Sequence, residues 1–472
     1  MVTLGSNTRI EHDLLGEREV PEERYYGIQT LRATENFRIT EIPISHYPDF
    51  IRAFAYIKKS AALANRDLGL LAESTADLIC RAADELLAGN HIDEFVVDMI
   101  QGGAGTSTNM NANEVIANIA LELAGHEKGR YDIVHPLNHV NMSQSTNDVY
   151  PSALRLTLSM KLDALADSMT LLRSDLARKA AEFADVIKMG RTQLQDAVPM
   201  TLGQEFGAYA IMVGEDVQRV REAQLLIREI NMGATAIGTG LNAHPDYART
   251  VTEHIRTLSG IPVVASEDLV EATQDTGAYV QLSGVLKRVA VKLSKICNDL
   301  RLLSSGPRAG LNEINLPRMA PGSSIMPGKV NPIIPEVVNQ VAFQVIGHDM
   351  TVTMAAEAGQ LELNVMEPVI AFNLFTSIDM LDRACTTLAS KCIAGITANR
   401  DLCRRMVEQS IGLVTALNPL IGYERSTEIA SEALATGGSV YDIVLQKGYL
   451  TRKQLEELLS PEAMTHPRYI HG

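Results

Sequence analysis

Tryptophan is absent from this chain of 472 residues, and aromatic side chains make up only 5% of it. Aromatic and β-branched residues favour strands, whereas alanine and leucine, which are abundant here, favour helices. The composition therefore predicts a mainly α-helical protein. Hydrophobic residues still account for 46% of the chain, which is enough for a large core and excludes global disorder.

Cysteine is also scarce: the five cysteines are widely spaced, and none forms a CxxC pair. This excludes a disulfide framework and a zinc ribbon, and it predicts reduced thiols in the core. His135 and His139 lie four residues apart, but Pro136 and Asn138 between them are turn residues, so we expect a structural role rather than a metal site. The glycine motif at 238–243 lacks the strand and helix of a dinucleotide-binding unit. We expect neither a metal nor a cofactor.

Positive charge is in deficit, because 42 lysines and arginines face 57 acidic residues and the net charge is −15. A nucleic-acid-binding protein needs a basic face, which this composition does not supply. No apolar run approaches the roughly 18–20 residues of a membrane span. The segment 1–17 carries charge where a signal peptide needs an apolar stretch. We therefore expect a soluble cytoplasmic protein with no nucleic-acid or membrane partner.

Long helices are expected in the middle of the chain. Between Leu154 and Leu176, leucine and methionine recur at steps of three and four, which indicates the apolar stripe of a helix in a bundle. Ser152 is the expected N-cap of this helix. A central bundle of five long helices is completed by similar stretches at 202–230, 273–304, 335–357 and 368–394. Their apolar faces are too extensive for five helices to bury alone, so we expect a homo-oligomer.

The remainder of the chain suggests a domain on each side of this bundle. We expect a mostly helical domain at 1–142, the bundle domain at 143–397, and a small helical domain at 398–472, where charge density rises and the segments shorten. Residues 102–113 are expected to form a loop, because small residues dominate there. Shorter helices are expected at 49–65, 74–88, 400–409, 426–436 and 451–459.

Four segments border these helices and are too polar to belong to a core. Each offers hydroxyls, amides or backbone N–H groups near a helix start, where donors are free and the helix dipole favours anions. Lys329 and Arg191 add positive charge in an otherwise acidic chain. Any one segment could be an ordinary capped turn, but together they would suit a small dianion such as a dicarboxylate. The four segments are 102–109, 143–148, 188–196 and 321–332.

The last of these segments resembles a known signature. Residues 322–331 read Gly-Ser-Ser-Ile-Met-Pro-Gly-Lys-Val-Asn, like the signature loop of the fumarase/aspartase superfamily, and the resemblance extends from about Arg9 to Tyr469. The chain is most similar to the aspartase (aspartate ammonia-lyase) branch. Residues 106–109 read Thr-Ser-Thr-Asn where class II fumarases have Thr-Gln-Ser-Asn, and Gln193 stands where fumarases have histidine. The resemblance implies a three-domain, mainly α fold with a long five-helix bundle, bundles that pair in a homotetramer, and sites shared among three subunits.

The resemblance also implies a reaction, the reversible elimination of ammonia from the small-molecule substrate L-aspartate to give fumarate. Removal of the weakly acidic Cβ proton builds a second negative charge on the adjacent carboxylate, and donors have to be aimed at this aci-carboxylate. Ser323 would be the general base, acting as an oxyanion once the loop 322–328 has closed around it. Asn147 would lie near the amino group, Lys329 and Asn331 would hold the other carboxylate, and Gln193 would bind without titrating. The implied substrate-binding residues are Thr106, Ser145, Thr146, Asn147, Thr192, Gln193, Ser324, Lys329 and Asn331.

Two alternatives remain at this point. A class II fumarase would hydrate fumarate to L-malate with the same fold and base, but the segment 106–109, Thr146 and Gln193 favour the aspartase branch. A non-catalytic structural member of the same fold would have no need of Ser323 and Lys329 together with the other polar residues of the site.

Overall fold

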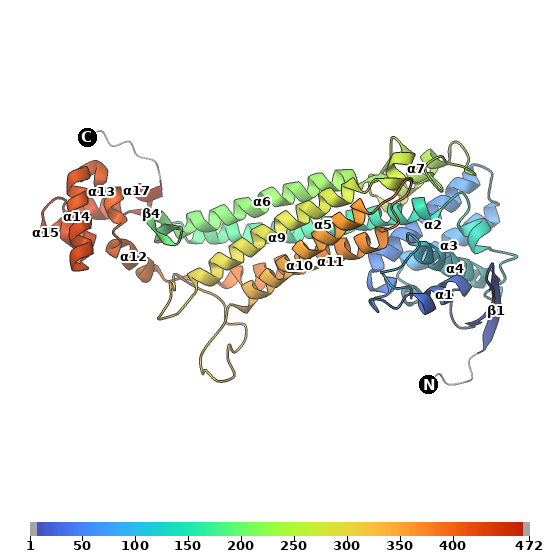
Figure 1. Ribbon diagram of the computed structural model, residues 1–472, viewed down its shortest axis with the longest axis horizontal. Coiled ribbons are helices and arrows are strands. Elements are labelled where there is room, and N and C mark those ends of the chain that lie inside the picture. The colour runs from blue at the N-terminus through green and yellow to red at the C-terminus, as the bar shows by residue number, and fades with distance from the viewer. Residues whose placement is uncertain (1–6, 466–472) are drawn as a thin grey trace. The chain divides into compact units, whose positions relative to one another are not determined.

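The computed structural model describes residues 7–465, most of which are helical (Figure 1). Residues 1–6, which begin the charged N-terminal segment considered above, and residues 466–472 lie outside the described part. The prediction of a mainly α protein is confirmed, since the strands within residues 7–465 form only short two-stranded sheets. None of the described helices is long and apolar enough to cross a membrane.

The five predicted long helices are present within the described residues. Their bundle is stabilised by buried stripe residues such as Leu154, Leu165 and Leu172, each with 0% exposure, so the three-and-four spacing did mark the packed face. The helices are α5 (Thr146–Glu182), α6 (Leu202–Ile227), α9 (Gly277–Leu303), α10 (Ile333–Glu357) and α11 (Glu367–Lys391).

Two of these helices differ from the prediction at their starts. The helix expected from 273 is interrupted at residues 275–276, which separate the short α8 (Leu269–Gln274) from α9. The expected N-cap at Ser152 is wrong, because α5 begins six residues earlier and Pro151 lies inside it. A proline in a helix leaves the carbonyl four residues earlier without its N–H partner. Here that carbonyl, of Asn147, accepts a hydrogen bond of 3.0 Å from the side chain of Asn231.

The described chain divides into two compact units, and every long helix contributes residues to both. The first unit comprises residues 1–166, 219–287 and 344–379, and the second comprises 167–218, 288–343 and 380–472. The three sequence-based domains stay a prediction.

Helices around an aromatic cluster form the first unit. Phe50 packs edge-on against Phe54, Tyr150 and Phe375, with ring centroids 5.1–5.4 Å apart. The helices predicted at 49–65 and 74–88 are confirmed as α2 and α3. Apart from α8 and the long helices, the elements of this unit are β1 (Thr8–Asp13), β2 (Gly16–Pro21), α1 (Ile28–Asn36), η1 (Ile44–His46), α2 (Pro48–Asp67), α3 (Glu73–Leu87), η2 (Ile92–Glu94), α4 (Thr106–Leu123), η3 (Pro136–Val140), β5 (Glu229–Ile230), α7 (Tyr247–Ser259) and β6 (Val264–Ala265). Strands β1 and β2 pair antiparallel, and β5 and β6 pair parallel.

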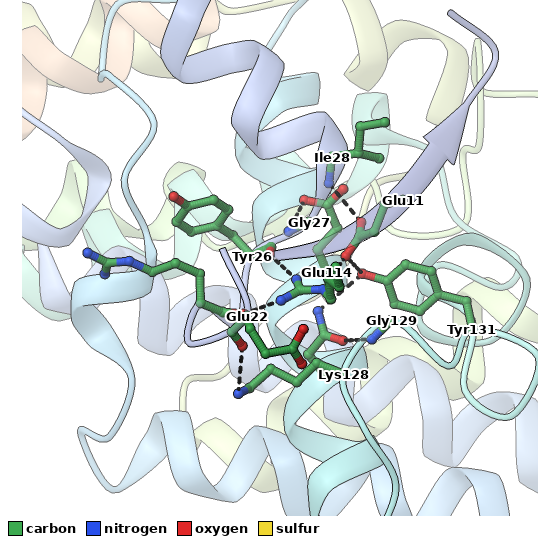
Figure 2. A network of polar contacts seen from close by, with 12 residues as sticks. Glu11, Glu22, Tyr26, Gly27, Ile28, Glu114, Lys128, Gly129 and Tyr131 are labelled. Atoms are coloured by element: carbon green, nitrogen blue, oxygen red, sulfur yellow. Dashed lines mark hydrogen bonds and ion pairs between the residues drawn. The ribbon is translucent and has the colours of Figure 1, made fainter. Parts of the chain in front are cut away.

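A buried polar network fixes α4 against the N-terminal hairpin and α1 (Figure 2). The carboxylate of Glu114, on α4, accepts hydrogen bonds of 2.9–3.1 Å from the backbone N–H groups of Gly27, Gln29 and Thr30 at the start of α1. Burial raises the pKa of Glu114 to about 7, although these N–H groups, at the positive end of the α1 dipole, favour its charged form. Arg9 pairs with Glu11 at 2.7 Å beside it. The network therefore sets the position of α4, whose first residue is Thr106.

The second unit contains a hairpin and the C-terminal helices. Ile187 and Met189 of the hairpin lie in one hydrophobic core with Val407, Leu417 and Ile429 of the C-terminal helices. The helices predicted at 400–409, 426–436 and 451–459 match α12, part of α14, and α16. The elements are β3 (Ile187–Thr192), β4 (Gln195–Thr201), β7 (Ile314–Asn315), η4 (Ile393–Gly395), β8 (Thr397–Ala398), α12 (Arg400–Gln409), α13 (Leu413–Ile421), α14 (Tyr423–Thr436), α15 (Val440–Gln446), α16 (Arg452–Leu458) and α17 (Pro461–Thr465). Both β3–β4 and β7–β8 are antiparallel.

Candidate active site

The first polar segment, 102–109, turns into a helix halfway along. The expectation of a loop at 102–113 is wrong from Thr106 onward, because α4 begins there after Gly105, which has a φ of 88°. The segment is also less exposed than its polarity suggests, since Thr108 and Asn109 are only 0% and 1% exposed. Their side chains remain satisfied inside the protein by hydrogen bonds to Gln101 and Thr146 respectively. Thr106 itself is exposed at the N-terminus of α4.

The second segment, 143–148, caps α5. The hydroxyl of Ser145 accepts a hydrogen bond of 3.2 Å from the backbone N–H of Asn147, and the carboxylate of Asp148 accepts one of 2.9 Å from the backbone N–H of Ser145. These reciprocal bonds resemble a capping box, so Ser145 takes the role expected of Ser152. The side chain of Asn147 donates to the carbonyl of Ala236 at 2.7 Å. Because Asn109 contacts Thr146, the N-termini of α4 and α5 lie together.

A buried lysine contacts residues at the starts of both α4 and α5. The ammonium of Lys58, on α2, donates to the side-chain oxygens of Asn109, Asn141 and Gln144 at 2.7–2.9 Å. Lys58 is not among the residues predicted from the sequence. It could have been found by its spacing, since it lies four residues after Phe54 on the buried face of α2.

The third segment, 188–196, forms the β3–β4 hairpin. Gln193 and Leu194 both have positive φ, 55° and 62°, which is the geometry of a type I′ turn. Thr192 and Gln193 are exposed at this tip. Arg191 does not supply a free positive charge, because its guanidinium pairs at 2.6 Å with the fully buried Glu313.

The fourth segment, 321–332, folds on itself around Ser323. The hydroxyl oxygen of Ser323 accepts hydrogen bonds from the backbone N–H groups of Ile325 at 3.2 Å and Met326 at 3.0 Å. The base of the loop is closed by Asn331, whose side chain donates to the carbonyl of Gly322 at 2.8 Å. Ser324 and Lys329 are exposed on the loop. Two N–H donors on one hydroxyl oxygen form a site that favours an oxyanion.

The histidine pair serves a turn, as expected. The ring Nδ1 of His139 accepts from the backbone N–H of His135 at 2.9 Å, and the ring of His135 accepts from Leu137 and Asn138 at the start of η3. Within residues 7–465, no cluster of three or more histidine, cysteine or acidic side chains could hold a metal ion.

The predicted site residues thus fall into three groups. Thr106 and residues 145–147 lie at adjoining helix starts in the first unit. Thr192 and Gln193 lie at the hairpin tip in the second unit, and residues 321–332 form the self-closed loop of the same unit.

Comparison with known proteins gives matches over most of the chain. Residues 16–347 match the family model described as Lyase, and residues 413–466 match the model described as Fumarase C C-terminus. An aspartate ammonia-lyase from Helicobacter pylori is 62% identical over 459 residues, which cover 97% of this chain and 98% of that protein.

Solved structures extend this similarity to the whole fold. The structure of fumarate lyase:delta crystallin from Brucella melitensis bound to cobalt has a TM-score of 0.95 and 54% identity, covering 98% of this chain and 100% of that one. A recombinant class II fumarase from Schistosoma mansoni has a TM-score of 0.92 but only 36% identity, with the same coverage of 98% and 100%.

Proposed function

This chain belongs to the fumarase/aspartase family of lyases, and from that premise we propose that it eliminates ammonia reversibly from L-aspartate to give fumarate. It is a carbon–nitrogen lyase. The observation that carries this conclusion is the 62% identity to an aspartate ammonia-lyase along nearly the whole of both chains, against 36% to a class II fumarase.

Ser323 is the proposed general base. A serine hydroxyl ionises only with difficulty, so the oxyanion needs donors that are already in place. The backbone N–H groups of Ile325 and Met326 supply two such donors to the oxygen of Ser323. Hydrogen bonds to the charged form favour that form, which supports proton abstraction from Cβ by this residue.

The first group of residues is proposed to hold the carboxylate that becomes the aci-carboxylate. Thr106, Ser145 and Thr146 offer hydroxyls at the N-termini of α4 and α5, where the helix dipoles also favour negative charge. Asn147 offers its side-chain carbonyl to the substrate ammonium. Charge that develops during proton removal therefore meets the hydroxyls of Ser145 and Thr146 at the N-terminus of α5, whereas Thr106 first has to give up the hydrogen bond of 2.7 Å that it donates to the carbonyl of Gly103.

The other two groups are proposed to hold the rest of the substrate. Lys329 and Asn331 would hold the second carboxylate, and Ser324 would support the loop around it. Thr192 donates its hydroxyl, and Gln193 donates an amide N–H without changing its charge.

We propose that the three groups meet between chains in a homotetramer. Phe343, Met350 and Met354 lie along α10 at a spacing of seven and four residues and are 64%, 62% and 65% exposed. Such an apolar stripe is typical of an interface, here with the same helix bundle of another copy. Sedimentation should give a tetramer, and a fully active monomer would contradict the shared site. The buried free cysteines fit a cytoplasmic enzyme.

Ultraviolet absorbance of fumarate tests the reaction directly. Purified protein is given L-aspartate in one cuvette and L-malate in another. We expect fumarate from L-aspartate only. Fumarate from L-malate alone would show a fumarase, and no fumarate from either would show a non-catalytic member of the fold.

A further inference from the structure

Lys58 is buried in a place where a lysine is costly. Its side chain is 0% exposed on the apolar face of α2, and its three hydrogen-bond acceptors, in Asn109, Asn141 and Gln144, are neutral amides. Burial lowers the pKa of Lys58 to about 7, and the nearby carboxylate of Asp148 opposes this only in part. An apolar side chain of similar length would leave these three amide oxygens without the donor that they share, so the charge of Lys58 is tied to the arrangement of the amides around it.

The ammonium determines how the side chain of Asn109 is oriented. A lysine ammonium carries only donors, so the atom of Asn109 that lies 2.7 Å from it has to be the carbonyl oxygen. The amide nitrogen of Asn109 therefore faces Asn141 Oδ1 at 3.1 Å and Thr146 Oγ1 at 3.2 Å. Asn141 Oδ1 also accepts from Lys58, so it cannot exchange roles with Asn109.

This orientation leaves the hydroxyl of Thr146 with a defined polarity. One lone pair of its oxygen accepts the N–H of Asn109, so its own hydrogen points away from Asn109. We propose that Lys58 is a positioning residue that acts through Asn109 to make Thr146 a hydrogen-bond donor to the substrate carboxylate. The inference rests on the proposed function, because an aci-carboxylate needs donors and an acceptor at this position would repel it.

Asn109→Asp is the most direct test. The carboxylate keeps an oxygen for Lys58 but puts a second oxygen, in place of the amide nitrogen, against Thr146. The hydroxyl of Thr146 then donates to this new carboxylate and is lost to the substrate. We expect kcat to fall about 10²–10³-fold, the usual effect of removing one such donor, with a smaller change in KM.

Asn113→Asp is the matched control. Asn113 is buried on the same helix and donates to Asn141 at 3.2 Å, yet it makes no hydrogen bond to Thr146. Asn113→Asp adds the same negative charge beside Asn141, so its kcat shows the effect of the charge and of weakened folding without the effect on Thr146. We expect it to retain at least ten times the kcat of Asn109→Asp, and equal losses in the two variants would overturn the inference.

A double-mutant cycle separates polarity from folding. Thr146→Val removes the hydroxyl whose hydrogen-bond direction Asn109→Asp is expected to change. We therefore expect the kcat of the double variant to be no lower than that of the slower single variant. If the fold-losses in kcat of the two single variants multiply in the double variant, Asn109 does not act through Thr146, and the inference is overturned. If Asn109→Asp does not fold, Lys58→Met takes its place in the same cycle, with the same two outcomes.

Binding of succinate, an unreactive dicarboxylate, separates this inference from the proposed function. Calorimetry on the full chain should give an affinity at least tenfold weaker for Asn109→Asp than for Asn113→Asp. Equal affinities would overturn the role of Lys58 even if the wild-type protein converts L-aspartate. A wild-type protein that binds succinate but forms no fumarate would overturn the proposed function and leave the polarity of Thr146 standing.

Discussion

Gly105→Ala should destabilise the protein more than its small size suggests. Gly105 has a φ of 88°, and a Cβ atom there would lie 2.1 Å from the ring of Tyr150. The ring cannot withdraw, because it is fully buried and packs edge-on against Phe50 at 5.4 Å. The left-handed backbone costs an alanine about 1–2 kcal/mol. Overpacking against the ring costs about 1–3 kcal/mol more, so the free energy of unfolding should fall by about 2–5 kcal/mol.

Gly103→Ala separates these two costs. Gly103 has the same φ of 88°, but the nearest atom to its added Cβ would be in Thr106 at 3.8 Å, an ordinary contact. We therefore expect it to lose only the backbone contribution of about 1–2 kcal/mol. Urea denaturation of both variants has to be done at one protein concentration, because assembly adds to the stability of an oligomer. Equal losses for the two variants would refute the role given to Tyr150.

Three further predictions concern the base, a buried ion pair and the dependence on pH. Ser323→Ala should lower fumarate production from L-aspartate by several orders of magnitude and leave the sedimentation coefficient unchanged. Glu313→Gln should lower the free energy of unfolding in urea by about 3–5 kcal/mol, since it removes the fully buried carboxylate that pairs with buried Lys188 and with partly buried Arg191. Burial raises the pKa of Glu367 from 4.5 to about 8, with Arg155 opposing the shift. The native state thus holds this proton more tightly, so stability is lost as the pH rises from about 4.5 to 8, and Glu367→Gln should remove up to about 1.4 kcal/mol of that loss per pH unit.

Each of these predictions has an outcome that would contradict it. Full turnover by Ser323→Ala would exclude the serine base. An unchanged urea midpoint for Glu313→Gln would mean that Glu205, which also pairs with Lys188 at 2.6 Å, suffices for that lysine. Parallel curves of stability against pH for the wild type and Glu367→Gln would show that Glu367 is charged in the native state throughout this range.

The long helices could be predicted from sequence because their packing repeats at every turn. The apolar stripe from Leu154 to Leu176 needs only local spacing to be recognised. Buried polar residues are different, because composition does not show which partner will satisfy them. Asn109 was expected in a loop, yet it is buried because Lys58 and Thr146, from two other elements, match its donor and acceptor atoms.

The candidate site could be predicted as a set of segments but not as a geometry. Arg191 was expected to face a ligand, but its partner Glu313 lies 122 positions away, where no local pattern connects the two. The hairpin turn was not predicted because its residues are unusual for such a turn. Gln193 and Leu194 adopt positive φ without glycine, asparagine or aspartate, the usual residues of such a turn.

The packing of β3 also bears on how related proteins can exchange parts. Ile187 and Met189 belong to the hydrophobic core of the C-terminal helices, although more than 200 positions separate them from Val407 and Leu417. A chimera that replaces only the segment after residue 398 would therefore set foreign core residues against native hairpin strands. Breakpoints that transfer residues 187–201 together with the C-terminal segment keep both sides of that core from one parent, and such a chimera would also take the parent's residues at the hairpin tip.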